Sequence, residues 1–464
     1  MHRLLRLFAV PCLLAAQSGP YSFLELTTVE TPKGREVAVA AGTLTLAPGA
    51  CTVTARTARN REAAKPITQK PACQQTAPGR FTLDAPTMLG GTLKLTASED
   101  GRVLAGAGAK LGAHTFFVAI PAPPAGSTAP VSTAGMYRAA WLQLLPLAPR
   151  GITSGLVNLP FTPRRVDETA SVVSHTTEFD DVTRELTFAV PKIAAKPDGT
   201  GTISFPKADA NLPLTGERDV LLSADGSIFL AWSSAAGPRD ILVGLREDPE
   251  ASSFSWMGAF AMTEWAATVP YELNTKPAAI ASASGAARNG GGGTLDLEQT
   301  IWDGKASTAL ITRNVCRTGT DGSSALGPQV AATQSNLVIG GNPMAFAGVH
   351  AGARNELSLD HGIFFGVRTS NQVPPAPSPL KAMHADGSAV DAAKPARSGE
   401  VITIEVPGYK PGPTRVLIDS LPAEAKPAAP LTVTVPKLKR GGMAPLAVEA
   451  PGLVHDITDL PVQP

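Results

Sequence analysis

Four carboxylates gather in one short stretch of the chain, where they could bind a cation. They are Glu178, Asp180, Asp181 and Glu185. Carboxylate oxygens are ligands that Ca²⁺ takes in proteins, including extracellular modules. The stretch lacks the DxDxDG order of a calcium loop, so a charged hairpin loop is the alternative interpretation of the same residues.

Three other titratable residues occupy matching places along the chain. His114, Asp240 and Asp360 each stand just before the apolar segment that closes a repeated unit. An aspartate at such a place can cap a turn by accepting hydrogen bonds from backbone amides. A catalytic carboxylate is the sharper interpretation, and the sequence leaves both open.

The sequence motifs of common catalytic sites are missing. No GxSxG, HExxH or HxH occurs, and Gly106-Ala107-Gly108 stands between two expected strands rather than before a helix. The histidines beyond His2 are dispersed: His114, His175, His350, His361, His384 and His455. Five tryptophans could line a sugar platform, but their apolar surroundings favour core packing: Trp141, Trp232, Trp256, Trp265 and Trp302. We predict no catalytic motif residue, no metal site and no cofactor.

The start of the chain has the order of a secretory signal peptide. Residues 1–16 place Arg3 and Arg6 before a short apolar run, which ends in the small residues Ala15 and Ala16. We therefore expect export and removal of this segment. The run is too short to span a bilayer as a permanent helix.

Cysteine usage agrees with export. Cys51, Cys73 and Cys316 remain after cleavage, and the first two lie in one loop-rich segment. Oxidising compartments permit disulfides, so we predict a Cys51–Cys73 bond. Two unpaired thiols are the alternative. The absence of any CxxC pair argues against a zinc site.

The composition restricts both the fold and the partners. The 464 residues include 44 Gly and 42 Pro, which disfavour helix interiors, and 43% hydrophobic residues, which suffice for packed cores. The net charge of +1 excludes a nucleic-acid binder that relies on bulk charge. No later segment is apolar for long enough to cross a membrane as a helix, so we expect no membrane span.

Two Pro-rich stretches divide the chain into units. Residues 121–135 and 369–380 are poor in residues that pack a core, and we interpret both as linkers. A softer break follows Glu247. These cuts define four bodies: body one (17–120), body two (136–246), body three (256–368) and body four (381–464).

The first three bodies resemble one another. Each closes with an apolar strand, a tight turn at Gly101, Gly226 or Gly341, a second strand, a loop and a third strand. Each also opens with a strand that bears an aromatic residue. Three such matches in the same order predict a triplication with the glycines at equivalent turns.

Within the bodies, apolar and polar residues alternate between Gly, Pro and Asp turns, which predicts antiparallel hairpins. The one helix-like stretch, Met257–Ala267, matches the aromatic opening of the other bodies and is expected to be a strand. We predict an all-β protein whose first three bodies hold six to eight strands each. They would form a six-bladed propeller or three tandem small barrels. For body four we predict an immunoglobulin-like β-sandwich.

The chain resembles secreted acidobacterial proteins of the Solibacter type, which combine β-rich repeats with a conserved C-terminal domain. Residues 221–226 (LLSADG) and 240–246 (DILVGLR) match the repeat phrase of that family. Residues 390–404 follow the opening of its C-terminal domain, with Asp391 in place of the usual Asn. The resemblance implies export and life at the cell surface or outside the cell, and no known activity.

Two classes of function follow from these observations. We predict a secreted or cell-surface, non-catalytic scaffold or binding protein, with an extracellular glycan or a cell-envelope component as its partner. The alternative is a secreted hydrolase or lyase that attacks extracellular glycans with carboxylates, a chemistry that leaves no sequence motif. Two carboxylates, or a carboxylate and a histidine, close together in a cleft would distinguish the enzyme from the binding protein.

Overall fold

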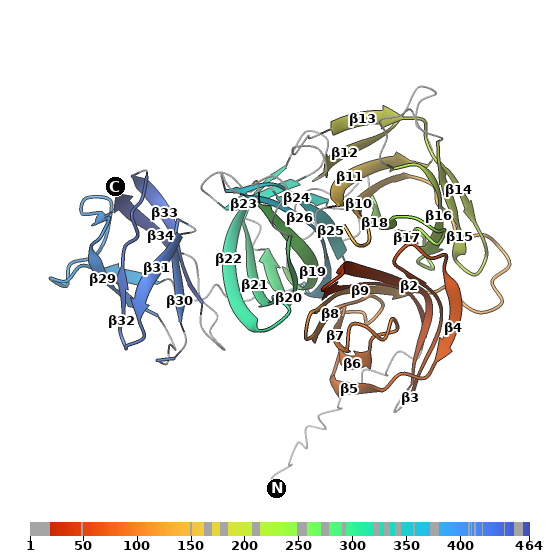
Figure 1. Cartoon of the computed structure of the whole chain (residues 1–464), viewed down its shortest axis with the longest axis horizontal. Helices are drawn as coiled ribbons and strands as arrows, with labels where there is room; N and C mark the ends of the chain where they lie inside the picture. Colours follow the sequence, from red (N-terminus) through yellow and green to blue (C-terminus); the bar gives the residue numbers. More distant parts are fainter. Residues whose placement is uncertain are drawn as a thin grey trace, which may run out of the picture.

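The computed structural model of the chain confirms that the protein is all-β (Figure 1). The residues that it describes form 34 strands and no helix. They are 19–47, 50–148, 151–161, 169–176, 184–206, 214–247, 258–270, 278–289, 294–318, 324–328, 335–338, 345–355, 358–371, 380–406, 409, 411–412, 414–419, 421–439, 441–449 and 458–464. The expected signal peptide (1–16), Gly341 and most of the second linker lie outside these ranges.

Body one is a single curled sheet of nine antiparallel strands, in the order β4-β3-β2-β1-β9-β8-β7-β6-β5. The chain runs as a meander whose first strand pairs with its last, with Tyr21 opposite Pro121. As a result, β4 and β5 form the two edges of an open seam. The strands are β1 Pro20–Thr31, β2 Gly34–Ala47, β3 Ala50–Arg59, β4 Lys65–Gln69, β5 Cys73–Ala77, β6 Arg80–Asp84, β7 Thr92–Ala97, β8 Leu104–Lys110 and β9 Ala113–Pro121.

Body two repeats this order of strands. Its sheet runs β13-β12-β11-β10-β18-β17-β16-β15-β14, so the first and last strands again pair and the seam lies between β13 and β14. The strands are β10 Met136–Leu144, β11 Ile152–Pro160, β12 Ala170–Thr176, β13 Arg184–Phe188, β14 Lys192–Ala195, β15 Thr200–Phe205, β16 Gly216–Leu222, β17 Ile228–Trp232 and β18 Arg239–Arg246.

Body three is a closed barrel of eight strands. Its first strand, which covers most of the helix-like stretch of the sequence, pairs with its last along nearly its whole length. The strands are β19 Gly258–Pro270, β20 Ala279–Asn289, β21 Thr294–Trp302, β22 Ser307–Thr318, β23 Ser324–Pro328, β24 Ser335–Val338, β25 Ala345–Asn355 and β26 Ser358–Ser370.

These sheet orders correct the propeller interpretation. A propeller would split each body into two separate four-stranded blades. Here each body forms one continuous sheet, because its first and last strands pair. The alternative of three small barrels matches the sheet order, with the barrel closed in body three and open along one seam in bodies one and two. Bodies one and two also hold more strands than expected.

The three bodies lie against one another (Figure 1). Apolar residues on their outer faces form one shared hydrophobic core. On β9, Phe116 belongs to this shared core, whereas the next residue, Phe117, belongs to the separate core inside body one. Strands such as β9 are buried on both faces, which explains their unbroken apolar runs. Each large side chain buried there contributes roughly 1.5–3 kcal/mol. Members of the shared core include Leu26, Val118, Leu142, Trp232, Trp265 and Val349.

The turns at Gly101 and Gly226 have the same hydrogen bonds. In each turn the glycine amide donates to a serine carbonyl three residues earlier. Tyr21 and Tyr137, from the first strands of their bodies, donate their hydroxyls to the carbonyls of Gly101 and Gly226 respectively. Both glycines have φ near +70° or +65°, the left-handed region that favours glycine. The equivalence of the third glycine stays a prediction, as does the triplication itself.

Body four contains eight strands in the order β27-β29-β32-β31-β30-β33-β34-β28. Inward residues from both halves of this order, such as Ile404 and Leu446, form one buried cluster. Figure 1 shows this body beside β22 of body three. The immunoglobulin-like assignment stays a prediction. The strands are β27 Lys381–Met383, β28 Ala396–Arg397, β29 Val401–Glu405, β30 Arg415–Ile418, β31 Leu421–Lys426, β32 Leu431–Thr434, β33 Gly442–Glu449 and β34 Thr458–Gln463.

Candidate functional site

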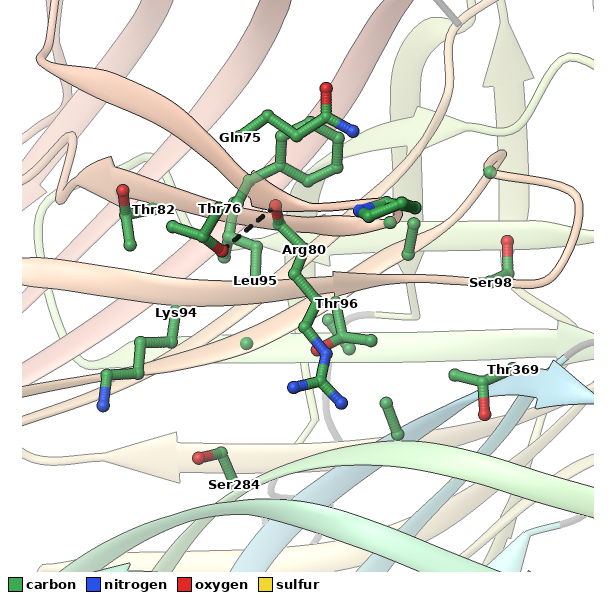
Figure 2. A pocket seen from close by; sticks show the side chains of 18 of the residues that line it. Gln75, Thr76, Arg80, Thr82, Lys94, Leu95, Thr96, Ser98, Ser284 and Thr369 are labelled. Carbon is green, nitrogen blue, oxygen red and sulfur yellow. Dashed lines mark hydrogen bonds between the residues drawn. The ribbon is translucent and has the colours of Figure 1, made fainter. Parts of the chain in front are cut away.

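A cleft of about 1010 Å³ is lined jointly by body one and body three. Body one contributes β5, β6, β7 and the turns at their ends, and body three contributes parts of β19, β20 and β21. Figure 2 shows this cleft, with Arg80 and Lys94 among the side chains of body one that project into it and Ser284 on the side of body three.

The alternation of side chains along β6 and β7 places polar groups in the cleft. Phe81 and Leu95 pack in the core inside body one, so the residues next to them point to the opposite face of the sheet. The strand register sets Arg80 beside Thr96 on that face. Polar residues that line the cleft from this face and from body three include Arg80, Thr82, Lys94, Thr96, Ser284, Gln299, Thr300 and Thr369.

The wall of the cleft that β6 and β7 form is positively charged. Arg80 and Lys94 are exposed, and neither forms an ion pair with any residue that the structure describes. Two acids also line the cleft: Glu99, whose Oε2 lies 3.9 Å from Arg368 Nε, and Asp100, which accepts hydrogen bonds within its own turn and keeps its negative charge. The wall of β6 and β7 can therefore attract an anionic group although the chain as a whole is almost neutral.

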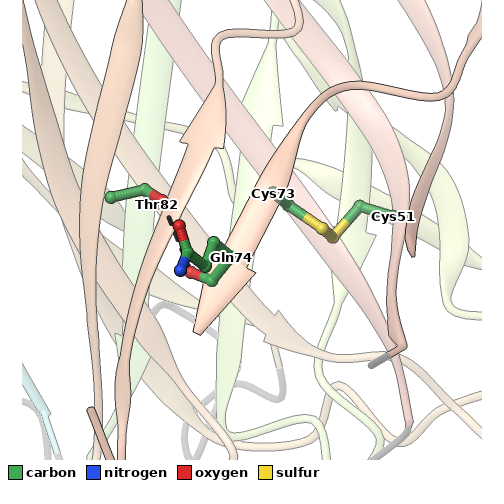
Figure 3. The surroundings of a disulfide bond; sticks show 4 residues. All are labelled: Cys51, Cys73, Gln74 and Thr82. Atoms are coloured by element: carbon green, nitrogen blue, oxygen red, sulfur yellow. Dashed lines mark hydrogen bonds between the residues drawn. A yellow bond between two sulfur atoms is a disulfide. The ribbon is translucent and has the colours of Figure 1, made fainter. Parts of the chain in front are cut away.

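A disulfide joins Cys51 and Cys73 at the wall of the cleft (Figure 3). Cys51 lies on β3 and Cys73 on β5, so the bond links the two sides of the open seam of body one. The bond fixes the position of the edge strand β5, on which Gln75 and Thr76 line the cleft.

Asp240, one of the predicted turn-capping or catalytic carboxylates, forms a buried ion pair with Arg218. Arg218 donates from Nε to both of its carboxylate oxygens at 2.8 Å and from Nη2 to Oδ2 at 2.6 Å. Both side chains are buried. A buried ion pair of this geometry satisfies the charges of both partners. Asp240 is therefore a structural partner of Arg218.

His114 is also buried, at the end of body one. Burial, and then the positive charge of Arg35, lower the pKa of His114 to about 4, so the imidazole is neutral at pH 7. The side chain of Asp360 lies outside the described part of the chain. Of the acidic patch, Glu178, Asp180 and Asp181 lie outside it as well, and nothing is described of the side chain of Glu185 on β13. Calcium binding by this patch stays a hypothesis beside the predicted charged hairpin loop.

A carboxylate and a histidine do meet inside the barrel of body three. Glu264 Oε1 on β19 lies 2.9 Å from His350 Nε2 on β25. Gln299 on β21 donates to Glu264 Oε2 at 2.6 Å, and the His350 ring lies 5.3 Å from the ring of Phe364. This is the kind of pair that would mark an enzyme, but neither member lines the cleft between bodies one and three.

The tryptophans that the structure places in the interior offer no exposed sugar platform. Trp141, Trp232 and Trp265 are buried, Trp302 is half-buried, and Trp256 lies outside the described residues. Within the described ranges, no group of three His, Cys, Asp or Glu residues could hold a metal ion. No helix there is long and apolar enough to cross a membrane.

Sequence reasoning missed Arg80 and Lys94, the residues that give the cleft its charge. On alternating strands such residues are typical of a solvated face. The available signal was the presence of two basic residues on the polar positions of adjacent hairpin strands. That signal does not reveal that body three lies opposite.

Comparisons with known proteins give no family. No family model matches the sequence, and no curated protein matches it. The chain is similar in structure to a DUF3598-family protein of unknown function from Nostoc punctiforme (12% identity, 51% of this chain and 96% of that one, TM-score 0.20). It is also similar to transferrin binding protein B from Neisseria meningitidis (10% identity, 76% of this chain and 77% of that one, TM-score 0.21). A third similar structure is kievitone hydratase from Nectria haematococca (10% identity, 77% of this chain and 91% of that one, TM-score 0.19). Such low TM-scores carry no argument about function.

Proposed function

We propose that the protein is an exported, non-catalytic binding protein whose cleft between bodies one and three holds a carbohydrate that carries acidic groups. The exposed and uncommitted charges of Arg80 and Lys94 support an anionic group on the ligand, because a charged hydrogen bond is stronger than a neutral one. The two cations suit a ligand with isolated acidic groups rather than a densely charged polyanion.

The remaining lining supports a sugar. Threonine and serine hydroxyls and the amide of Gln75 can donate to and accept from sugar hydroxyls. The volume of about 1010 Å³ is at the upper end of the range for small-ligand sites, which favours an oligosaccharide over a single sugar. The disulfide at the cleft wall supports the export part of the proposal, because disulfides persist in oxidising compartments.

The test is a glycan array that contains both uronic-acid and neutral oligosaccharides, followed by titration of the best ligand. We expect binding of acidic glycans that weakens with salt. Loss of a hydrogen bond to a charged group costs about 1.5–3 kcal/mol, so Arg80→Gln and Lys94→Gln should each weaken binding at least about tenfold.

The matched control is Lys192→Gln on β14, an exposed lysine of body two that does not line the cleft. It should bind like the wild type. Wild-type affinity in the Arg80→Gln, Lys94→Gln double variant would contradict the proposal, and so would equal binding of neutral and acidic glycans.

A second candidate function is a glycan hydrolase or lyase with His350 as the proton acceptor. The 2.9 Å approach of Glu264 to His350 favours it, because a nearby carboxylate stabilises the protonated form of an imidazole. A screen with acidic polysaccharides tests it: turnover should vanish in His350→Gln and persist in Lys192→Gln. If the wild type binds acidic glycans but does not turn them over, the enzyme hypothesis is contradicted and the binding-protein proposal stands.

A further inference from the structure

Three large apolar side chains are exposed at loop tips of bodies one and two. Met88, Leu111 and Leu147 are 72%, 78% and 49% exposed. Each lies in a turn between strands: Met88 between β6 and β7, Leu111 between β8 and β9, and Leu147 between β10 and β11. Single exposed apolar residues are ordinary, so their meaning depends on whether the three tips lie together and on what surrounds them.

Hydrogen bonds and close contacts place the three tips on one rim. The Leu147 amide donates to the carbonyl of Arg35, next to the β1–β2 turn. The end of β1 is bonded in turn to the β8–β9 turn, where the Glu30 amide donates to the Gly112 carbonyl. A Cβ on Gly91 would lie 3.0 Å from the side chain of Lys110, which brings the Met88 loop to the same end of body one.

Two of the tips have a backbone conformation that apolar residues seldom adopt. Met88 has φ +61° and Leu147 has φ +65°, in the left-handed region that favours glycine. Such a conformation costs free energy and persists where the position has a function. Glycine would be the cheaper residue in both places, so the presence of exposed Met and Leu there points to a role for the side chains.

The same rim is positively charged. Four exposed lysines flank the tips, and none forms an ion pair with a residue that the structure describes: Lys33, Lys70, Lys110 and Lys305. Two hydrogen-bond contacts support their placement. The Gly112 amide donates to the carbonyl of Gly304, and Gln69 donates to the carbonyl of Pro86 in the Met88 loop.

Three acids also lie on the rim, and one of them is paired with an arginine. Glu30 Oε1 lies 2.8 Å from Nε of the buried Arg35. Asp303 accepts the amides of Lys305 and Ala306 within its own turn. Asp84 accepts the hydroxyl of Thr92. These hydrogen bonds leave the charges of Asp84 and Asp303 in place, so four lysines face two aspartates that form no ion pair within the described part of the chain, and the rim keeps an excess of positive charge.

We propose that this rim docks on an anionic lipid bilayer, with Met88, Leu111 and Leu147 inserted among the headgroups and the lysines against the lipid phosphates. Separate apolar tips ringed by lysines fit a bilayer surface, which accepts isolated side chains and attracts basic residues. A protein partner would favour a continuous packed patch.

Docking through this rim leaves the cleft open. On β7, Thr92 lies at the end that bears the tips, whereas Ala97 leads to the turn at Ser98–Gly101, which lines the cleft. The cleft turns and the tips therefore lie at opposite ends of the same strands of body one. The rim proposal does not depend on what the cleft binds.

The test is flotation of the full chain with vesicles of equal parts phosphatidylcholine and phosphatidylglycerol, compared with vesicles of phosphatidylcholine alone. We expect binding to the anionic vesicles that weakens with salt. The triple variant Met88→Ser, Leu111→Ser, Leu147→Ser should bind at least about tenfold more weakly, because each tip loses its apolar contact with the headgroup region.

Two further variants keep the result specific. Met88→Gly with Leu147→Gly removes both apolar tips at positions where glycine is unstrained, so it should lose vesicle binding while its melting temperature stays the same or rises. The control, Leu421→Ser with Met443→Ser, removes two exposed apolar residues of body four and should bind vesicles normally.

Three outcomes would overturn the proposal. The first is equal binding of the triple variant and the wild type to anionic vesicles. The second is an equal loss of binding in the body-four control. The third is a wild type that ignores vesicles but self-associates, with the triple variant monomeric on a sizing column, which would assign the rim to a second copy of the chain.

Discussion

The carboxyl of Glu25, which is buried inside body one, accepts hydrogen bonds from both the backbone amide and the side-chain hydroxyl of Thr87. Its Oε2 accepts the Thr87 amide at 3.0 Å, and its Oε1 accepts the Thr87 hydroxyl at 2.6 Å. The Thr27 hydroxyl also donates to Oε1, at 2.7 Å. Thr87 begins the loop tip of Met88, so a buried carboxyl anchors one of the tips that we assign to membrane docking.

Glu25→Gln should change the pH dependence of stability. Burial is the largest influence on Glu25 and raises the pKa of its carboxyl above 4.5, against the opposing hydrogen bonds of Thr87 and Thr27. A raised carboxyl pKa contributes stability that is present at low pH and is lost as pH rises through the folded-state pKa. The variant lacks this loss, so its free energy of unfolding relative to wild type should increase above pH 4.5. Urea unfolding at a series of pH values measures this, and a difference that is constant with pH would contradict it.

His114 should give the opposite pH dependence. Its pKa is lowered from 6.5 to about 4, so the unfolded chain binds the proton more tightly than the folded chain does. Stability is therefore lost as pH falls from 6.5 toward 4, by roughly 3 kcal/mol in total at about 1.36 kcal/mol per pH unit. His114→Gln should remove this dependence in thermal or urea unfolding. A variant that keeps the full acid sensitivity of the wild type would show that other groups cause it.

Removal of the Cys51–Cys73 disulfide should destabilise body one. The bond closes a loop with a sequence separation of 22 residues, and a loop of that size contributes roughly 3 kcal/mol by restricting the unfolded chain. Cys51→Ser with Cys73→Ser should lower the free energy of unfolding by that order and weaken ligand binding in the cleft. Thiol labelling of both cysteines in non-reduced, exported protein would contradict the bond itself.

Gly226→Ala should be more destabilising than Gly399→Ala. Both glycines have positive φ, of +65° and +82°. A Cβ on Gly226 would lie 2.0 Å from the carbonyl oxygen of Ser132, whereas a Cβ on Gly399 would meet nothing within 4 Å. The backbone strain is shared and costs about 1 kcal/mol, so the difference between the two melting temperatures reports the clash. Equal decreases in melting temperature would show that Ser132, in the first linker, moves away from the new Cβ at no cost in free energy.

The sequence alone determined the class of fold, because local chemistry decides whether a segment forms a strand. Glycine and proline exclude long helices, and a period of two shows which residues share a face. This reasoning predicted the strand at β19 despite its helix-like composition. It also pointed to Gly101 and Gly226, whose turns share the same hydrogen bonds. Secretion and the C-terminal resemblance stay predictions.

The tertiary structure decided what covers each face. Alternation shows that Glu25 and Arg80 lie on particular faces of their strands, but not which distant segment lies opposite. The loop of Thr87, 62 residues away, buries Glu25, whereas body three stands across the cleft from Arg80 and leaves it uncommitted. Pairing of the first strand with the last likewise decided between barrel and propeller, because it joins segments about a hundred residues apart. Periodicity is a local property, and these long-range contacts leave no trace in it.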